Sequence, residues 1–540
     1  MSDFELETIA EVLDHQTEAF GTETFVACDD RSLSYQELRE RSLRLAGGLA
    51  RLGLQPGDRV AILSENSLEF IVSFFACARL GLVQVPLNVF LRGEFLRYQL
   101  EDSGSVAAIV DTLGLEAIQA LEPTIQLAHV IVAGEFAGGD GEGLSFGRVE
   151  ESDPPTDLPA LRSSDTAAIV YTSGTTGMPK GCVIPHGMFT QVYPIHQGAG
   201  YIVPGDRLLT PSPMFHMGFL AGMLATSLCS GASIWCTRKF SASTFLQTAR
   251  EIRATVIYAV GSVGMLILAQ APSPEDRKPS NLRVALLTPM PAQSQLDFEK
   301  RFGVPVVAEN YGQSECIVIG IGGIDQPRQR GSAGQPASFV DVAIVDEHDH
   351  PVTRGEVGEI VVRPRQSDMM FKGYWNDPEA TLEAWRNLWH HTGDLARQSA
   401  DGTLWIIDRK KDSIRRRGEN VSSIELEGAI GRHPEVQAVA VHAVASEWGD
   451  DEIKACIVAR NELDPAEMFA FFKRELPYFA VPRYVELMEA LPVNAVGRVR
   501  KQTLRERGLT SETWDFEALG MTVSRDERRG RGFSDPALTE

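Results

Sequence analysis

Residues 171–181 read Tyr-Thr-Ser-Gly-Thr-Thr-Gly-Met-Pro-Lys-Gly and begin at the end of a predicted strand over 167–171. The three glycines let the backbone turn its N–H groups toward an anion, and the hydroxyls and the lysine can donate hydrogen bonds to it. The usual P-loop pattern, G-x-x-x-x-G-K-[ST], is not met. The segment therefore predicts a phosphate-binding loop of another kind, with a plain surface loop as the alternative. Its candidate phosphate ligands are Thr172, Ser173, Gly174, Thr175, Thr176, Gly177 and Lys180.

Helix and strand patterns alternate through the first third of the chain. Ser34 can cap a helix that runs to about residue 52, and a second helix over 67–80 ends at Gly81. Short apolar runs between such helices are typical of buried strands, which we expect over 59–63, 83–86, 107–110, 129–132 and 167–171. This order predicts an α/β fold whose sheets are covered by helices on both faces.

The pattern changes in the second half. Short strands broken by glycine over 343–362 predict a β-rich subdomain, and a basic segment follows at 409–417. Helix and strand signals resume up to about residue 508. We therefore expect a large N-terminal domain over 1–410, a small α+β domain over 411–510 and a disordered tail over 511–540.

Composition excludes several classes of partner. The 540 residues include 73 acidic and 51 basic side chains, for a formal net charge of −22. This balance argues against a nucleic-acid partner and against an anionic membrane. The seven cysteines form no C-x-x-C pair and no Cys/His metal cluster, so buried, reduced thiols of a cytoplasmic protein are expected.

Two stretches could be mistaken for membrane or targeting segments. Residues 1–10 carry acids where a signal peptide carries basic and apolar residues. Residues 217–236 carry no charge, but glycines and serines interrupt them. We expect a buried helix there, followed by a glycine break and a strand over 232–236.

The segment 171–181 is very similar to the phosphate-binding signature of the adenylate-forming (ANL) superfamily. Three more of the family's motifs follow in order: Asn310-Tyr-Gly-Gln-Ser-Glu315, Gly373-Tyr-Trp-Asn-Asp-Pro-Glu379 and Thr392-Gly-Asp394. The resemblance covers about residues 10–508. Over that length the chain resembles an acyl-CoA ligase, an enzyme that activates a carboxylic acid with ATP and Mg2+ and transfers it to coenzyme A.

The resemblance implies roles for single residues. Glu315 would hold the magnesium ion, Tyr311 would stack on adenine beside Asn310, and Ser314 would touch the α-phosphate. Asp394 would bind both ribose hydroxyls with help from Arg409. Three further residues would shape the acyl pocket: His216, Gly312 and Gln313.

The resemblance also implies a moving C-terminal domain. Lys411 stands at the family's hinge, although it could be a solvated lysine in a basic run. The following loop would enter the site after rotation, with Gly418 lying against the thiol arm of coenzyme A and Arg415 and Arg417 near its phosphates. Glu425 and Glu427 are expected on a solvated helix face.

One departure touches the first half-reaction. The family motif L-P-[KR]-T-x-[ST]-G-K ends in a catalytic lysine, whereas residues 491–498 end in Arg498. A planar, forked guanidinium does not reproduce the geometry of an ammonium, although Lys501 could substitute. Leucines also replace small residues in Leu286-Leu-Thr-Pro-Met-Pro291.

The favoured function is therefore an acyl-CoA ligase whose adenylation step is in question. The alternatives are a ligase that only forms the thioester from a supplied acyl-adenylate, an enzyme that loads a carrier protein, and a silent acyl- or nucleotide-binding protein. A homodimer and a partner adenylating enzyme remain open.

Overall fold

The computed structural model describes residues 6–121, 125–134, 143–172, 178–277, 280–410, 414–416, 419–421, 423–445, 451–476, 480–493 and 499–523. The chain forms two compact units. The N-terminal unit comprises 1–343, 361–392 and 398–405, and the C-terminal unit comprises 344–360, 393–397 and 406–540. Unlike the boundary expected at 410, this division places parts of the β-rich region in the C-terminal unit.

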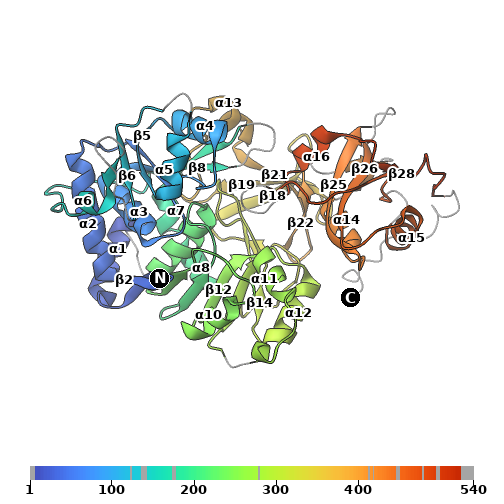
Figure 1. The fold of residues 1–540 in the computed structure, drawn as a ribbon, viewed down its shortest axis with the longest axis horizontal. Coiled ribbons are helices and arrows are strands. Elements are labelled where there is room, and N and C mark those ends of the chain that lie inside the picture. Colours follow the sequence, from blue (N-terminus) through green and yellow to red (C-terminus); the bar gives the residue numbers. More distant parts are fainter. Residues whose placement is uncertain are drawn as a thin grey trace. The chain divides into compact units, whose positions relative to one another are not determined.

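The first sheet of the N-terminal unit has seven strands, of which only β8 and β9 pair antiparallel. Its order is β7 (Leu144–Ser145), β6 (His129–Val132), β5 (Ser105–Val110), β3 (Arg59–Leu63), β4 (Val83–Pro86), β8 (Thr166–Thr172) and β9 (Lys180–Pro185). The helices of this region, all labelled in Figure 1, are α1 (Ile9–Phe20), α2 (Tyr35–Arg51), α3 (Leu68–Leu80), α4 (Gly93–Ser103), α5 (Thr112–Gln119) and α6 (Phe146–Glu150). The predicted alternation of helices and parallel strands is confirmed here.

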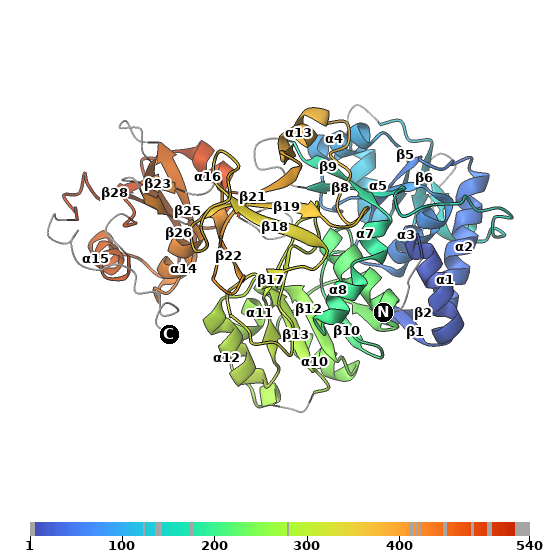
Figure 2. The ribbon, with the colours of Figure 1, turned by 180° about the vertical axis from the view of Figure 1, so that it is seen from behind.

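The second seven-stranded sheet is parallel except at β1 and β2. Its order is β14 (Val306–Val307), β13 (Val284–Thr288), β12 (Val256–Val260), β10 (Arg207–Thr210), β11 (Ser233–Cys236), β1 (Thr24–Cys28) and β2 (Arg31–Ser34). The chain between β9 and β14 also forms the helices α7 (Gly187–Thr190), α8 (Tyr193–Gly198), η1 (Gly218–Ala225), α9 (Thr226–Ser230), α10 (Phe245–Glu251), α11 (Gly261–Leu268), η2 (Pro274–Arg277) and α12 (Ala292–Phe302). Figure 2, which views the molecule from behind, labels α7, α8, α10, α11 and α12.

Local sequence explains where these helices begin and end. Ser34 forms a capping box with Glu37 at the start of α2, as its position predicted. The Ser67 side chain caps α3 by accepting from Phe70 N over 3.1 Å, and Gly81 ends that helix with a φ of +65°. The uncharged stretch 217–236 folds as a buried helix, a break and strand β11, as expected. Its first part, η1, is a π-helix, which the sequence did not predict.

Shorter strands make up two further sheets. One has the antiparallel order β15 (Asn310–Tyr311), β16 (Gly320–Ile321) and β17 (Gln335–Pro336). The other has the order β18 (Val340–Val345), β19 (Gly358–Pro364), β21 (Trp389–Gln398) and β20 (Trp385–Arg386), and β22 (Leu404–Arg409) pairs with β21. Helix α13 (Pro378–Ala384) precedes β20. The predicted β-rich character of 343–362 is confirmed.

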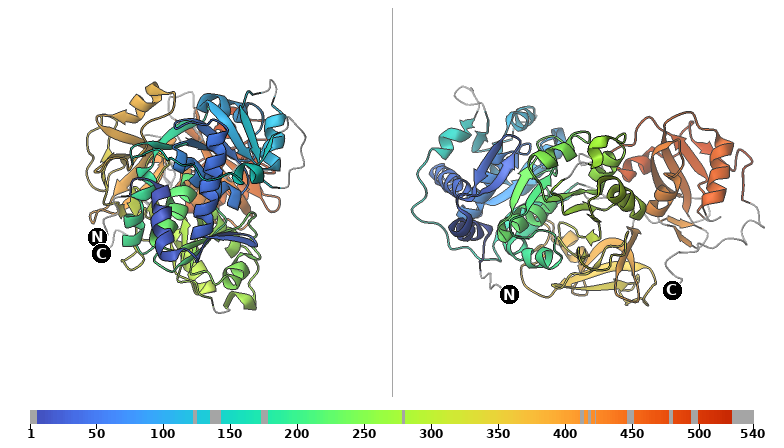
Figure 3. Two further views of the ribbon diagram at one scale, coloured as in Figure 1. Left: turned by 90° about the vertical axis from the view of Figure 1, so that its left-hand side faces the viewer. Right: turned by 90° about the horizontal axis from the view of Figure 1, so that it is seen from below.

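After residue 410, the described residues of the C-terminal unit form a four-stranded sheet, a hairpin and three helices. Figure 3 shows this part of the chain in orange and red. The sheet order is β25 (Val436–Ala445), β26 (Asp451–Ala459), β27 (Tyr484–Leu487) and β28 (Trp514–Asp515). The hairpin is β23 (Ile414–Arg416) and β24 (Glu419–Val421), and the helices are α14 (Ser423–Ile430), α15 (Pro465–Glu475) and α16 (Lys501–Arg507).

The disordered tail expected from residue 511 is wrong at its start. Trp514 and Asp515 pair with β27, and Phe516 is 1% exposed in the core of the C-terminal unit. Residues 524–540 lie outside the described part of the chain. All seven cysteines are buried and free, as predicted. Among the described helices, none combines the length and the apolar character needed to cross a membrane.

Candidate functional site

The β8–β9 hairpin positions the first candidate residues. Thr172 at the end of β8 pairs with Lys180 at the start of β9, and the Thr172 hydroxyl donates to the Lys180 carbonyl over 3.3 Å. Five predicted phosphate ligands, Ser173, Gly174, Thr175, Thr176 and Gly177, lie outside the described residues. The hairpin therefore fixes the two ends of the predicted loop and the lysine that follows it.

Lys180 and Glu315 lie on the same tyrosine. The Lys180 ammonium is 5.1 Å from the centroid of the Tyr374 ring, a cation–π distance. The Tyr374 hydroxyl donates to Glu315 Oε1 over 2.9 Å. Burial and the negative charge of Glu315 raise the pKa of Tyr374 above its usual range, so the phenol remains a donor.

Backbone hydrogen bonds hold this tyrosine in place. The segment 372–375 runs along β9, where Lys372 N donates to Val183 O over 2.8 Å and Trp375 N donates to Gly181 O over 2.7 Å. Phe371 N donates to Glu315 O over 2.9 Å. Three sequence motifs that are far apart in the chain thus meet at one place. Tyr374 lies in a motif identified from the sequence, but its role as the link between Lys180 and Glu315 was not predicted.

The segment of residues 310–315 combines a short strand and a tight turn. Asn310 and Tyr311 form β15, and Gln313 and Cys316 exchange two backbone hydrogen bonds of 2.8 and 3.1 Å. Gln313 Nε2 also donates to Thr392 O over 2.9 Å. Ser314 precedes Glu315 in this turn. These contacts tie the segment to the strand that leads toward Asp394, but the nucleotide roles of Asn310, Tyr311 and Ser314 stay predictions.

Gly312 has a steric reason to be glycine. A Cβ at this position would lie 2.0 Å from the Ile317 carbonyl oxygen. Replacing Gly312 by alanine is therefore expected to shift the turn and to lower the free energy of unfolding by about 1–3 kcal/mol. We also expect Gly312→Ala to lower the apparent affinity for ATP, because Tyr311 and Glu315 flank the shifted turn.

Gly198→Ala is the matched control, because no atom lies within 4 Å of a Cβ built at Gly198. Thermal melting and ATP titration would compare the two variants. Equal behaviour of Gly312→Ala and Gly198→Ala would show that the turn tolerates a side chain.

His216 follows the carboxyl end of β10 and leads directly into η1. Its ring centroid is 4.4 Å from that of Phe215, and its carbonyl accepts hydrogen bonds from Phe219 N and Leu220 N, each 3.0 Å long. The side chain is half-buried. This position is compatible with the predicted role in the acyl pocket, which stays a prediction.

Asp394 and Arg409 are neighbours within the C-terminal unit. Arg409 Nε lies 3.2 Å from Asp394 Oδ1, and Asp394 is only 4% exposed. A second ion pair braces the same turn, because Lys410 Nζ is 2.8 Å from Glu359 Oε2 and Gly393 N donates to Glu359 Oε1 over 3.1 Å. The two residues predicted to hold the ribose therefore lie together.

Lys501 is held by its own network. Its ammonium is 2.8 Å from Glu427 Oε1 and 2.5 Å from the Ser423 hydroxyl, which in turn donates to Asp408 Oδ2 over 2.7 Å. Burial raises the pKa values of both Asp408 and Glu427. The expectation that Glu427 lies on a solvated face is wrong, because this carboxylate also accepts from Val441 N over 2.8 Å.

Several predicted residues cannot be placed. Lys411, Arg417, Gly418 and Arg498 lie outside the described residues. Arg415 belongs to β23, and only its backbone is described. The hinge, the coenzyme A contacts and the position of the arginine that replaces the family lysine thus stay predictions.

A magnesium site at Glu315 is compatible with the donors present. In the part of the chain that the structure describes, no cluster of three or more His, Cys, Asp or Glu side chains could bind a metal ion alone. Magnesium is commonly held by one or two carboxylates together with substrate phosphates and waters. Glu315 supplies one such carboxylate beside Lys180.

Comparison with known families gives two matches. The model of the AMP-binding enzyme family matches residues 13–375, and that of the AMP-binding enzyme C-terminal domain matches residues 425–498. The chain is 32% identical over 517 residues to a crotonobetaine/carnitine–CoA ligase of Salmonella paratyphi B, covering 92% of this chain and 99% of that protein. A ligase of the same name from Escherichia coli O157:H7 is 31% identical, with 92% and 98% covered.

Solved structures show the same architecture. O-succinylbenzoate coenzyme A synthetase from Bacillus subtilis, in complex with AMP, has a TM-score of 0.79 and 26% identity and covers 92% of this chain and 98% of its own. ATP-bound MatB from Rhodopseudomonas palustris has a TM-score of 0.80 and 26% identity, with 93% and 99% covered.

Proposed function

Because the chain belongs to the AMP-binding enzyme family and is an acid–thiol ligase of the adenylate-forming superfamily, we propose that it carries out both half-reactions of an acyl-CoA ligase. It activates a carboxylic acid with ATP to acyl-AMP and then transfers the acyl group to coenzyme A. The observation that carries the proposal is the meeting of Lys180 and Glu315 at Tyr374, 5.1 Å and 2.9 Å away.

Charge and position explain the first half-reaction. The Lys180 ammonium would face the β- and γ-phosphates, and Glu315 would hold Mg2+, which would supply neutralisation of phosphate charge. The substrate carboxylate attacks the α-phosphorus, the bond to the bridging oxygen breaks, and pyrophosphate leaves. The protein contributes alignment and electrostatic stabilisation of the transition state.

The second half-reaction uses groups of the C-terminal unit. Rotation about Lys411 removes Arg498 and brings the 415–421 loop to the acyl-adenylate, with Arg415 and Arg417 near the coenzyme A phosphates and Gly418 against its thiol arm. The thiol sulfur attacks the acyl carbonyl and AMP leaves. Asp394 and Arg409 hold the ribose in both steps.

Arg498 supplies the cation between the carboxylate and the α-phosphate. The alternative donor, Lys501, already contacts Glu427 and Ser423 (2.8 and 2.5 Å) and is 13% exposed. Withdrawing Lys501 would leave Glu427 without its positive partner in a largely buried site, which is costly. This favours the arginine over Lys501 as the acting group.

The acid is best sought among those of the relatives. Two ligases at 31–32% identity are named for crotonobetaine and carnitine, so these acids come first in a panel. His216, Gly312 and Gln313 are the proposed pocket residues. His216→Ala should therefore change the ratios of kcat/KM between the acids more than it changes the KM for ATP.

The test compares wild type with Arg498→Lys and Lys501→Met. We expect wild type and Arg498→Lys to release pyrophosphate with the same acid, within about tenfold of one another. Lys501→Met should keep the wild-type rate of pyrophosphate release per folded molecule, since Lys501 stabilises the fold through Glu427 and Ser423 and does not contact the substrates. Loss of pyrophosphate release in Lys501→Met, with normal melting, would instead assign adenylation to Lys501.

A second candidate is a ligase that only forms the thioester from a supplied acyl-adenylate. It is favoured by arginine at position 498 together with the engagement of Lys501 in its own network. Pyrophosphate release by Arg498→Lys but not by wild type would establish it. A carrier-protein acceptor would be indicated by acyl transfer to the carrier's phosphopantetheine and none to coenzyme A.

A further inference from the structure

The carboxylate of Glu309 is buried without a charged partner. Glu309 is 1% exposed, and its Oε1 atom has no hydrogen-bond partner among the described residues. Its Oε2 atom accepts from Ala308 N over 3.2 Å, its one hydrogen bond in the part of the chain that the structure describes. An unpaired buried carboxylate is expensive, because the lost hydration is not replaced.

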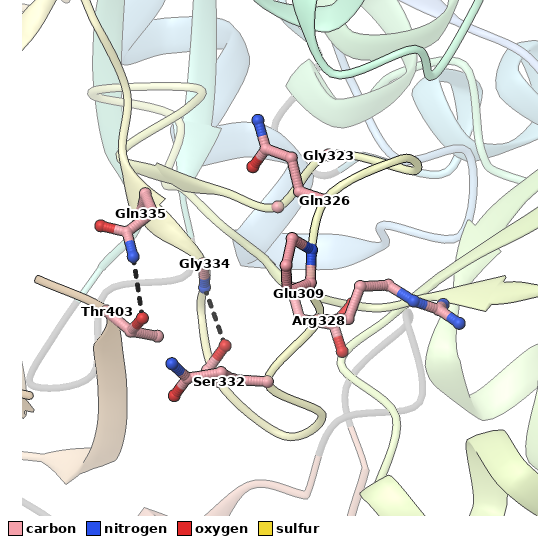
Figure 4. A pocket seen from close by; sticks show the side chains of 11 residues that line it. Glu309, Gly323, Gln326, Arg328, Ser332, Gly334, Gln335 and Thr403 are labelled. Atoms are coloured by element: carbon pink, nitrogen blue, oxygen red, sulfur yellow. Dashed lines mark hydrogen bonds between the residues drawn. The ribbon is translucent and has the colours of Figure 1, made fainter. Parts of the chain in front are cut away.

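This carboxylate lies at a small cavity of the N-terminal unit (Figure 4). The cavity volume is about 30 Å³, and the remaining lining is mostly polar. Oxygen-bearing side chains of Ser332, Gln326, Gln335 and Thr403 line it. The cavity therefore offers the oxygens of one carboxyl group and several uncharged oxygens.

Glycines bring the backbone close to the cavity. Gly334 has a φ of +79°, and a Cβ there would lie 2.5 Å from Ile321 O. A Cβ at Gly322 would lie 2.8 Å from Glu309 Cβ. Side chains at these two positions would displace the walls, so the space beside Glu309 depends on both glycines.

The nearby arginines do not neutralise Glu309. Arg328 lies 3.1 Å from Glu299, and Arg330 lies 2.9 Å from the same carboxylate. Figure 4 shows the Arg328 guanidinium pointing away from Ser332 and Gln335. Both guanidinium groups thus pair with Glu299, and no cationic side chain among the described residues pairs with Glu309.

We propose that this cavity binds a monovalent metal cation of the potassium type through Glu309 Oε1 and neutral oxygens. A single positive charge would balance the one carboxylate of Glu309. The lining has no second free carboxylate, and the described residues hold no cluster of three acidic, His or Cys ligands of the kind that strong divalent sites use. Neutral oxygens that replace a hydration shell are the usual ligands of potassium.

The cation connects to the proposed nucleotide site through the chain. Glu309 immediately precedes β15, and Gly322 N donates to Glu309 O over 2.6 Å. A bound cation would fix the start of the strand that carries Asn310 and Tyr311. This consequence for ATP rests on the proposed function, whereas binding of the cation does not.

The binding test compares potassium, rubidium and tetramethylammonium chlorides at equal ionic strength. We expect the melting temperature of wild type to be about 2–4 °C higher in potassium or rubidium, and the difference to vanish in Glu309→Gln. Glu18→Gln, which removes an exposed carboxylate, should keep the wild-type difference. Equal melting of wild type in all three salts would overturn the proposal.

Rubidium anomalous scattering from wild-type crystals gives a second readout that needs no variant. A peak beside Glu309 Oε1 supports the site, and an ordinary water there contradicts it. The KM for ATP should rise about tenfold in tetramethylammonium. A rubidium peak without any pyrophosphate release would keep the cation site and reject the proposed function.

Discussion

Replacing Glu315 by glutamine is expected to slow ATP-dependent pyrophosphate release by about 10²–10³-fold. The Glu315 carboxylate and the Lys180 ammonium both contact Tyr374. Removing one preorganised charge contact from a transition state typically costs about 3–4 kcal/mol. A glutamine oxygen can still accept from the Tyr374 hydroxyl, so the local fold should persist.

Tyr374→Phe is the matched control for this prediction. It removes the 2.9 Å hydrogen bond to Glu315 but keeps the ring beneath Lys180 and the carboxylate itself. A hydrogen bond to a charged group is worth about 1.5 kcal/mol or more, so a loss of about tenfold is expected, smaller than that of Glu315→Gln because the carboxylate remains. The rates of pyrophosphate release by Glu315→Gln and Tyr374→Phe would be measured in stopped-time assays over a range of Mg2+ concentrations. A Glu315→Gln rate within a few-fold of wild type would exclude Glu315 as the metal ligand.

Glu486→Gln is expected to lower the stability of the C-terminal unit by about 3–5 kcal/mol. Glu486 and Lys454 are both fully buried and form an ion pair, and Lys454 also donates to Gly508 O over 2.5 Å. Arg507 Nε lies 2.8 Å from the other oxygen of Glu486. Removing one partner of a buried pair leaves an uncompensated charge in a medium of low dielectric.

Hydrogen exchange of the β26 and β27 amides would report this loss within the C-terminal unit. The double variant Lys454→Met/Glu486→Leu should recover most of it, because no unpaired charge remains in the core. Glu475→Gln, which breaks an exposed pair with Arg474, should cost less than about 1 kcal/mol. If Glu486→Gln exchanged no faster than Glu475→Gln, the pair would not be stabilising this unit.

Local signals predicted the elements of the N-terminal unit well. The strand over 59–63 and the helix capped by Ser67 appear where turn, cap and apolar run agree. The same local signals could not predict that the helix η1 is of the π type. Its residues are almost all apolar, so no hydrophobic face sets a period, and its wide turn depends on tertiary packing.

Tertiary contacts explain the wrong predictions. Glu427 has the helical spacing of a surface residue, but Lys501, more than seventy residues later, partners it. Trp514 and Phe516 fall in a charged stretch, yet their alternate spacing was a strand signal, and Phe516 packs against Phe472 with ring centroids 6.1 Å apart. The linking role of Tyr374 likewise appears only when β9 and the 372–375 segment lie side by side.

The most direct test follows acyl-AMP and acyl-CoA in one reaction. Wild-type protein, ATP, Mg2+ and crotonobetaine, carnitine or other acids are mixed without coenzyme A, which is added after a delay, and the products are followed by mass spectrometry. The account predicts acyl-AMP and pyrophosphate before the addition, and acyl-CoA and AMP after it. Conversion of synthetic acyl-adenylates to acyl-CoA without any acyl-AMP from free acids would contradict a complete ligase.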